Sequence, residues 1–158
     1  MDKILSLLEK NALLSAEELA VMCDEKTEEI RERINEYEAN GTIVGYKALI
    51  DWDKTDREYV GATIELRVSP KPDRGFDHIA EKICLYPEVQ SVQLMSGSYD
   101  LQVVIEGKTL RDVSNFVFNK LAPMDGVIST ATHFVLRKYK DKGVIYSAPN
   151  EDLRGNII

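Results

Sequence analysis

The sequence predicts an α+β protein of two modules: an N-terminal winged helix-turn-helix over residues 1–50 and a C-terminal ferredoxin-like β-α-β-β-α-β sandwich over residues 59–140. Two observations predict this class. The first module has three short runs with apolar side chains at helical spacing, followed by a β-prone stretch. After a polar linker at 51–58, strand-like and helix-like segments then follow the order of a split β-α-β fold. Residues 141–158 are a C-terminal tail.

Three helices are expected in the first module. The first ends near Lys10, and the second begins at Ser15, which forms a capping-box pattern with Glu18. The third runs from about residue 27 to 40, and Gly41 ends it with a left-handed residue. Each helix has one apolar face for a common core. The residues of these faces are Ile4, Leu5, Leu7, Leu8, Leu19, Ala20, Met22, Ile30, Ile34 and Tyr37.

A β hairpin is expected after the third helix. Residues 42–50 are apolar and β-prone around Gly45. Three helices with a tight second turn, followed by a strand pair, make a winged helix-turn-helix.

The second module alternates strands and helices. In the first strand, the apolar side chains fall on one face, as in a half-buried strand. Thr109 and Asp112 form a capping pattern at the start of the second helix. Both helices are expected on one face of an antiparallel sheet. The expected strands are 59–68, 89–95, 101–106 and 127–139, and the expected helices are 74–85 and 109–121.

Three short motifs carry a family resemblance. Residues 33–46 are similar to the run R-hydrophobic-x-x-L-E-x-x-G-x-I-x-G-Y of the Lrp/AsnC (leucine-responsive, feast/famine) transcription regulators. The turn at 97–100 resembles the G-x-Y-D signature of that family's effector-binding domain, and residues 130–136 resemble its T-x-T-x-x-V-L strand. The resemblance covers nearly the whole chain. It implies a sequence-specific DNA-binding transcription regulator that responds to an amino acid or related small metabolite.

The third helix is the expected DNA-reading element, because the outward N-terminal residues of this helix meet base edges in the major groove. The part of the chain that contains this helix is acidic, since residues 1–58 carry 8 Lys/Arg against 15 Asp/Glu and account for the whole net charge of −7. Outward glutamates oppose binding to phosphates. The helix departs here from the family, whose recognition helix is richer in Ser, Thr and basic residues. The candidate DNA-binding residues are Lys26, Thr27, Glu28, Arg31, Glu32, Arg33 and Lys47.

Two alternatives stay open for the first module. One is that Arg33 pairs with a nearby glutamate, such as Glu29 one turn earlier, instead of touching DNA. The broader alternative is that the chain is a metabolite-binding or protein-interaction module whose helix-turn-helix no longer reads DNA directly.

The resemblance implies an amino-acid effector bound between subunits near the 97–100 turn. Asp100 offers a carboxylate to an ammonium group, and Thr130 and Thr132 project their hydroxyls from one strand face. The structural alternative is that Gly97 only permits a hairpin, Asp100 only bonds to turn N–H groups and the threonines are ordinary strand residues. The candidate effector-binding residues are Gly97, Ser98, Tyr99, Asp100, Asp125, Thr130 and Thr132.

The sheet also predicts self-association. With both helices on one side, its bare face is expected to expose apolar residues, which a second copy would cover. We therefore expect a homodimer, and the resemblance implies assembly to higher oligomers such as octamers.

Other classes of protein are disfavoured. The sequence has no phosphate loop, nucleophile elbow or paired-carboxylate motif, so we expect neither an enzyme nor a cofactor. His78, at a position open to the surface, and His133 have no Cys or second His nearby, so no metal site is expected. Cys23 and Cys84 lie far apart and fit a reduced, cytoplasmic setting. No apolar run reaches the roughly 18 residues that span a bilayer, so no membrane partner is expected.

Overall fold

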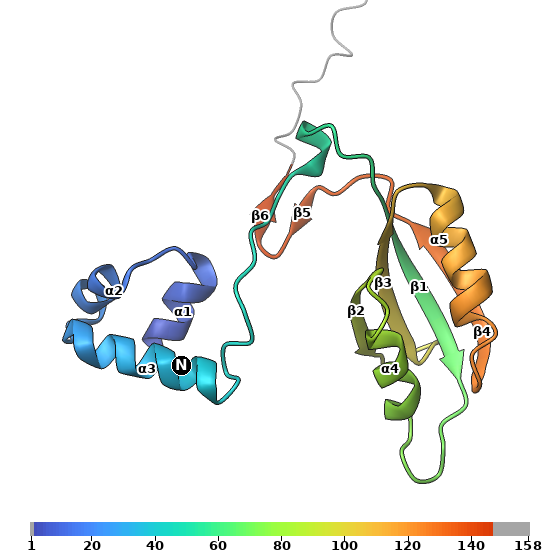
Figure 1. Cartoon of the computed structure of the whole chain (residues 1–158), viewed down its shortest axis with the longest axis horizontal. Coiled ribbons are helices and arrows are strands. Elements are labelled where there is room, and N and C mark those ends of the chain that lie inside the picture. Colours follow the sequence, from blue (N-terminus) through green and yellow to red (C-terminus); the bar gives the residue numbers. More distant parts are fainter. Residues whose placement is uncertain (1, 147–158) are drawn as a thin grey trace, which may run out of the picture. The chain divides into compact units, whose positions relative to one another are not determined.

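The structure is a computed structural model, and it describes residues 2–146. The chain divides after Ile50 into two compact units, which we call unit 1 and unit 2 (Figure 1). Each unit is described by itself.

Unit 1 contains three helices, α1 (Lys3–Lys10), α2 (Ala16–Cys23) and α3 (Thr27–Ala39). The predicted start and stop signals are confirmed, because Ser15 and Glu18 form the capping box of α2 and Gly41, at φ +77°, follows the end of α3. One residue from each helix, Ile4, Leu19 and Ile30, is fully buried in the common core. Burying each of these side chains contributes roughly 1.5–3 kcal/mol, so the three together hold the helices in place.

The prediction of a β hairpin at residues 42–50 is wrong for the single chain. Within the described residues this segment contains no strand, and Val44 is 95% exposed. The Asn40–Gly41 pair, which could have made a hairpin turn, instead ends α3: the side-chain oxygen of Asn40 accepts from the Thr42 N–H at 2.9 Å. No second tight turn of this type remains to fold the segment back on itself. Residues 42–50 therefore form one segment, which is exposed apart from the half-buried Ile43 that packs against the core of unit 1.

Unit 2 is the predicted α+β sandwich, in the predicted β-α-β-β-α-β order. Its antiparallel strands lie in the order β2 (Val89–Leu94), β3 (Leu101–Gly107), β1 (Val60–Val68) and β4 (Val127–Phe134), and both helices cover the same face of the sheet (Figure 1). Thr109 and Asp112 form the capping box that the sequence predicts. The elements are a 3-10 turn η1 (Trp52–Lys54), β1 (Val60–Val68), α4 (Asp77–Cys84), β2 (Val89–Leu94), β3 (Leu101–Gly107), α5 (Leu110–Phe116), a π-helical turn η2 (Val117–Leu121) and β4 (Val127–Phe134).

The two faces of this sheet differ in chemistry. Ala62, Ile64 and Leu66 of β1 are fully buried against the helices. The alternating residues point to the other, open face. This face is mostly polar, so the expectation that it exposes apolar residues is wrong. From the register of the strands, the residues of the open face are Gly61, Thr63, Glu65, Arg67, Ser91, Gln93, Gln102, Val104, Glu106, Ser129, Ala131 and His133.

Two elements are shorter than the sequence predicts. Helix α4 begins at Asp77 rather than near residue 74, because Lys71 and Gly75 exchange two backbone hydrogen bonds and Gly75 sits at φ +54° in the resulting turn. Strand β4 ends at Phe134 rather than at 139. Its partner β1 begins at Val60, only two residues before the Ala62 that stands opposite Phe134. The chain therefore loses its partner strand soon after one further backbone hydrogen bond, from the Val135 N–H to the Gly61 carbonyl.

His78 is also placed differently from the prediction. It is buried, with 7% of its surface exposed, and its Nδ1 lies 3.0 Å from the Gly75 carbonyl. In the tail, β5 (Lys140–Asp141) and β6 (Val144–Ile145) form a small hairpin apart from the main sheet. Residues 147–158 of the tail lie outside the described residues.

Candidate functional site

The N-terminal half of α3 presents the predicted DNA-reading surface. Glu28, Arg31 and Glu32 are exposed. The positive charges on this surface are balanced within unit 1: Arg31 forms an ion pair with Glu17 of α2, and the Lys26 ammonium lies 3.7 Å from a carboxylate oxygen of Glu29. Of the other predicted residues, Thr27 is half-buried and Lys47 lies in the exposed segment 42–50. The surface is therefore accessible but carries little uncompensated positive charge.

Arg33 occupies a network that joins α3 to the start of α1. Its guanidinium donates to Asp2 at 2.5 Å and to both carboxylate oxygens of Glu25, at 3.0 and 2.8 Å. The Tyr37 hydroxyl donates to the same Asp2 oxygen at 2.7 Å. Contacts with Tyr37 and Glu25 raise the pKa of Arg33 above its already high value. The glutamate that pairs with Arg33 is thus Glu25 and not Glu29, and the network favours a structural role for this arginine.

Acidification is expected to destabilise unit 1 through Asp2. The hydrogen bond from Tyr37 lowers the pKa of this carboxyl, and the backbone of Leu5 and the charge of Arg33 add to the effect against an opposing contribution from burial. A carboxyl with a depressed folded pKa stabilises the fold above its unfolded pKa and loses that contribution as pH falls through the folded pKa. The free energy of unfolding should therefore fall below about pH 4.

Urea unfolding of Asp2→Asn, followed by circular dichroism across pH, tests this expectation. The variant should lose part of the pH dependence, whereas Asp24→Asn, at an exposed aspartate of the same unit, should keep it. Asp2→Ala should cost about 1 kcal/mol more, because the Asp2 carboxylate also caps α1 by accepting from the N–H groups of Ile4 and Leu5. An unchanged pH profile in Asp2→Asn contradicts the expectation.

The predicted effector-binding turn is tied to the end of β1. A carboxylate oxygen of Asp100 accepts from the Val68 N–H at 2.8 Å, and the Asp100 N–H donates to the Leu66 carbonyl at 2.9 Å. The Arg67 side chain donates to the Ser98 carbonyl at 2.9 Å. One carboxylate oxygen of Asp100 thus accepts a hydrogen bond from the neighbouring strand β1 rather than from the turn itself.

A second loop reaches the same end of β1 from the β4 side. The Gly126 carbonyl accepts from the Ser69 N–H at 2.8 Å, and Gly126 lies at φ +90°. The neighbouring Asp125 carboxylate lies 3.5 Å from the Lys71 ammonium. The structure therefore brings the 97–100 turn and Asp125 to one end of the sheet.

The two candidate threonines lie on the helix-covered face. Thr130 and Thr132 stand opposite Leu66 and Ile64 in the register, and both are half-buried. Their hydroxyls share a face, as predicted. This face is opposite to the one that carries Arg67, whose side chain holds the 97–100 turn. Within one chain the threonines and the Ser98 carbonyl are thus on different faces.

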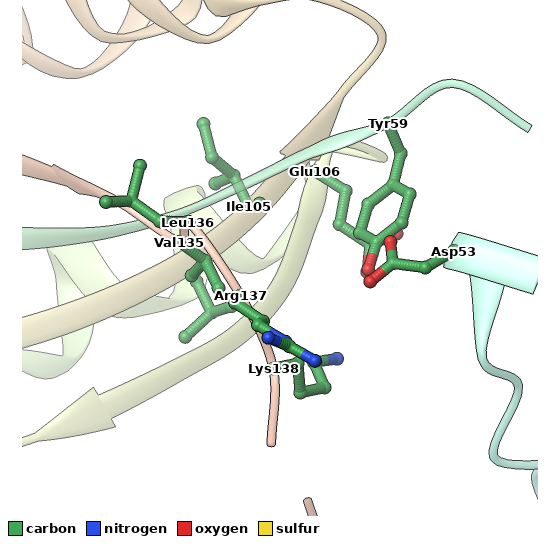
Figure 2. A pocket seen from close by; sticks show the side chains of 10 residues that line it. Asp53, Tyr59, Ile105, Glu106, Val135, Leu136, Arg137 and Lys138 are labelled. Atoms are coloured by element: carbon green, nitrogen blue, oxygen red, sulfur yellow. The ribbon is translucent and has the colours of Figure 1, made fainter. Parts of the chain in front are cut away.

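A cavity of about 150 Å³ lies at the other end of the sheet, where β1 begins. Figure 2 shows Asp53 and Tyr59 on one side of the view and Val135 and Leu136 on the other. These residues could not be grouped from the sequence, because the lining comes from residues 53 and 59, from β1 and β3 and from the chain after β4, which only folding brings together. The basic pair Arg137–Lys138, which follows β4 after two apolar residues, was the one available signal. The lining residues are Asp53, Tyr59, Gly61, Val104, Ile105, Glu106, Val135, Leu136, Arg137 and Lys138.

Two negative findings concern the described part of the chain. Across residues 2–146, no group of three His, Cys, Asp or Glu side chains is arranged to hold a metal ion. No helix in that range has the length and apolar character needed to cross a bilayer.

Comparison with known proteins identifies the family. The family model of the Lrp/AsnC ligand binding domain matches residues 61–145. YugG of Bacillus subtilis, an HTH-type transcriptional regulator, is 43% identical over 153 residues, which cover 96% of this chain and 92% of the relative. The chain belongs to the Lrp/AsnC family. The predicted resemblance and the prediction of a transcription regulator are thereby confirmed.

Solved structures share the fold of this Lrp/AsnC regulator. A transcriptional regulator of Neisseria meningitidis in complex with L-Met has a TM-score of 0.70 at 24% identity, covering 89% of this chain and 93% of that one. AsnC of Escherichia coli has a TM-score of 0.67 at 22% identity, covering 91% and 94%. At these identities the likeness concerns the fold alone, and the predicted fold class is confirmed.

Proposed function

We propose that this Lrp/AsnC regulator reads its operators with α3 and that an amino acid bound by unit 2 controls it. The observation that supports DNA binding by α3 is the tight turn between α2 and α3. Asp24, at φ +59°, makes this turn tight and leaves the N-terminal half of α3 exposed for a major groove. We place the regulator in the cytoplasm and assign it no enzymatic step.

Binding to the chain's own upstream DNA, measured across a salt series, tests this function. A complex that prefers this sequence over a shuffled one and weakens steeply with salt supports it, because phosphate contacts release counterions. Absence of binding at low salt, with and without amino acids, contradicts it. The alternative of a metabolite-binding or protein-interaction module would then stand.

Removing negative charge from α3 is expected to tighten DNA binding. At a surface, one like-charge repulsion costs on the order of 1 kcal/mol, so Glu28→Gln and Glu32→Gln should each raise affinity about fivefold at low salt. If Glu32 accepts a hydrogen bond from cytosine, Glu32→Gln should in addition lower the preference for the specific sequence. Fluorescence anisotropy with labelled specific and shuffled duplexes measures both quantities.

The matched control for these variants is Glu81→Gln, at an exposed glutamate of α4 in unit 2. It makes the same change in net charge away from α3 and should leave DNA affinity unchanged. An equal gain in this control would show that net charge alone acts. No gain in either α3 variant would contradict the placement of α3 against DNA.

The effector part of the proposal rests on the end of β1, where the 97–100 turn and the Asp125 loop meet. The Neisseria relative, which is in complex with L-Met, supports an amino acid as the class of ligand. A thermal-shift screen against the twenty amino acids tests it, with operator DNA as the positive control. No shift with any amino acid, alongside a shift with DNA, contradicts the effector assignment.

We also propose that the regulator acts as a homodimer or higher oligomer. Exposed β-prone segments are templates for pairing with another chain. Segment 42–50 fits this description, with Val44 95% and Tyr46 51% exposed. Sedimentation velocity at several protein concentrations measures the assembly, and a monomer throughout contradicts the proposal.

A further inference from the structure

Positive charge is concentrated in the segment that follows β4. Residues 137–142 contain four basic side chains and one acidic side chain, in a chain whose net charge is −7. This run leads into β5 and continues to the turn before β6, which Figure 1 shows as a small hairpin apart from the main sheet. We call residues 137–146 the basic hairpin. It belongs to unit 2, whereas the acidic residues in excess lie within residues 1–58.

The basic hairpin has a tight turn with a lysine at its tip. Strands β5 and β6 pair over two residues each, and Lys142 and Gly143 form the turn between them. Both turn residues have positive φ, +46° and +82°, as in the type I′ turns that join the strands of two-residue hairpins. The Tyr146 N–H donates to the Tyr139 carbonyl at 3.0 Å and closes the base of the hairpin. The position of Lys142 at the tip is therefore fixed by the strand pairing.

Three cations of the basic hairpin are not neutralised. Arg137, Lys140 and Lys142 are exposed, and within residues 2–146 none of them forms an ion pair. The fourth cation, Lys138, lies 3.3 Å from a carboxylate oxygen of Asp141. On the predicted DNA-reading surface of α3, by contrast, the cations lie against glutamates. The basic hairpin therefore offers the uncompensated positive charge that α3 lacks.

Aromatic rings orient two of these cations. The Arg137 guanidinium lies 4.9 Å from the centre of the exposed Tyr139 ring, and the Lys138 ammonium lies 5.3 Å from that of Tyr146. A ring restricts a guanidinium without neutralising its charge. Arg137 thus keeps the planar fork of donors that binds a phosphate through two hydrogen bonds.

We propose that the basic hairpin binds the phosphate backbone of duplex DNA, as a second contact in addition to α3. The inference rests on the proposed function, because the partner is the same operator DNA. At the rise of an extended strand, residues 137–142 span up to about 17 Å, over which one DNA strand carries about five phosphates. The three cations can therefore meet different phosphates. Such contacts add affinity and carry no sequence information directly.

A salt series with a hairpin variant tests the second contact. The full-length chain and the triple variant Arg137→Gln, Lys140→Gln, Lys142→Gln would be titrated with labelled specific and shuffled duplexes. Each lost phosphate contact lowers the slope of log affinity against log salt by about 0.9 and weakens binding about fivefold near 0.1 M salt. We expect the triple variant to lose about two to three units of slope. Its affinity should fall by the same factor on both duplexes, so the sequence preference is kept.

Two further variants make the test specific. Lys82→Gln removes an exposed positive charge from α4 of the same unit and is the matched control for Lys142→Gln, so it should keep the wild-type slope. Asp141→Asn removes the carboxylate partner of Lys138 and should raise affinity for both duplexes about fivefold. Unfolding cannot produce such a gain. Circular dichroism and sedimentation velocity check the fold and the assembly of each variant.

Several outcomes overturn the second contact and leave the proposed function intact. They are an unchanged slope in the triple variant, an equal loss in Lys82→Gln and Lys142→Gln, and no gain in Asp141→Asn. A triple variant with an altered oligomeric state would assign the hairpin to contacts between subunits instead. Binding to phosphatidylglycerol vesicles that the triple variant loses, with an unchanged DNA slope, would assign it to a lipid surface. Absence of wild-type DNA binding at low salt would contradict the proposed function and the second contact together.

Discussion

Ile30→Ala is expected to unfold unit 1 and abolish DNA binding. Ile30 is fully buried and contributes the α3 side of the core that Ile4 and Leu19 complete. Truncating a buried isoleucine to alanine typically costs 2–5 kcal/mol. A unit of about fifty residues has only roughly 3–7 kcal/mol of stability, so the loss removes most of it. Thermal unfolding by circular dichroism, with DNA binding by anisotropy, measures the effect.

The matched control is Val21→Ala on α2, where the side chain is 84% exposed. It removes a β-branched side chain without opening a cavity and should keep both stability and DNA affinity. The transition of unit 2, reported by Trp52, should be unchanged in both variants. Wild-type DNA affinity in Ile30→Ala would show that the common core of unit 1 is not required for binding.

Asp100→Ala is expected to destabilise unit 2 and to lose the effector. Its carboxylate is the acceptor for the N–H of Val68, a residue only 3% exposed. Leaving a buried N–H without an acceptor costs about 1–3 kcal/mol. The turn would lose one of the bonds that hold it at the end of β1. Urea unfolding followed by Trp52 emission measures this loss of stability.

Asp100→Asn separates the structural role from ligand binding. An asparagine keeps an oxygen that can accept from Val68, so most of the stability should remain. It removes the charge that would pair with a ligand ammonium, so calorimetric affinity for the effector should fall about tenfold or more. Wild-type affinity in this variant would leave Asp100 with the structural role alone.

Local signals in the sequence located most of the elements. The Ser15–Glu18 and Thr109–Asp112 capping boxes start α2 and α5 as predicted, and Gly41 follows α3. These signals work because a cap satisfies backbone groups within a few residues of itself. The alternating and helical patterns of apolar residues predicted the order of strands and helices in the sandwich. These patterns are also local, because each depends only on which side of one element is buried.

Features that depend on two distant segments were not predictable in the same way. The partner of Arg33 is set by where α1 begins and α2 ends, which places Asp2 and Glu25 around its guanidinium. The length of β4 is set by the start of β1, its neighbour in the sheet. The open face of the sheet was expected to be apolar, and its polar character became clear only with the register of four strands.

The sequence by itself determined the family, the order of the helices and strands, and the acidic character of the first module. It also located the 97–100 turn and the Asp125 loop, although not that both meet at one end of β1. The tertiary structure alone decided that residues 42–50 form no hairpin within one chain, and it placed Asp53 and Arg137 around one cavity. The physical reason is the separation along the chain over which each kind of interaction acts. Caps, turns and amphipathic periods act over a few residues, whereas a pairing partner or a cavity wall depends on segments that the chain brings together only when it folds.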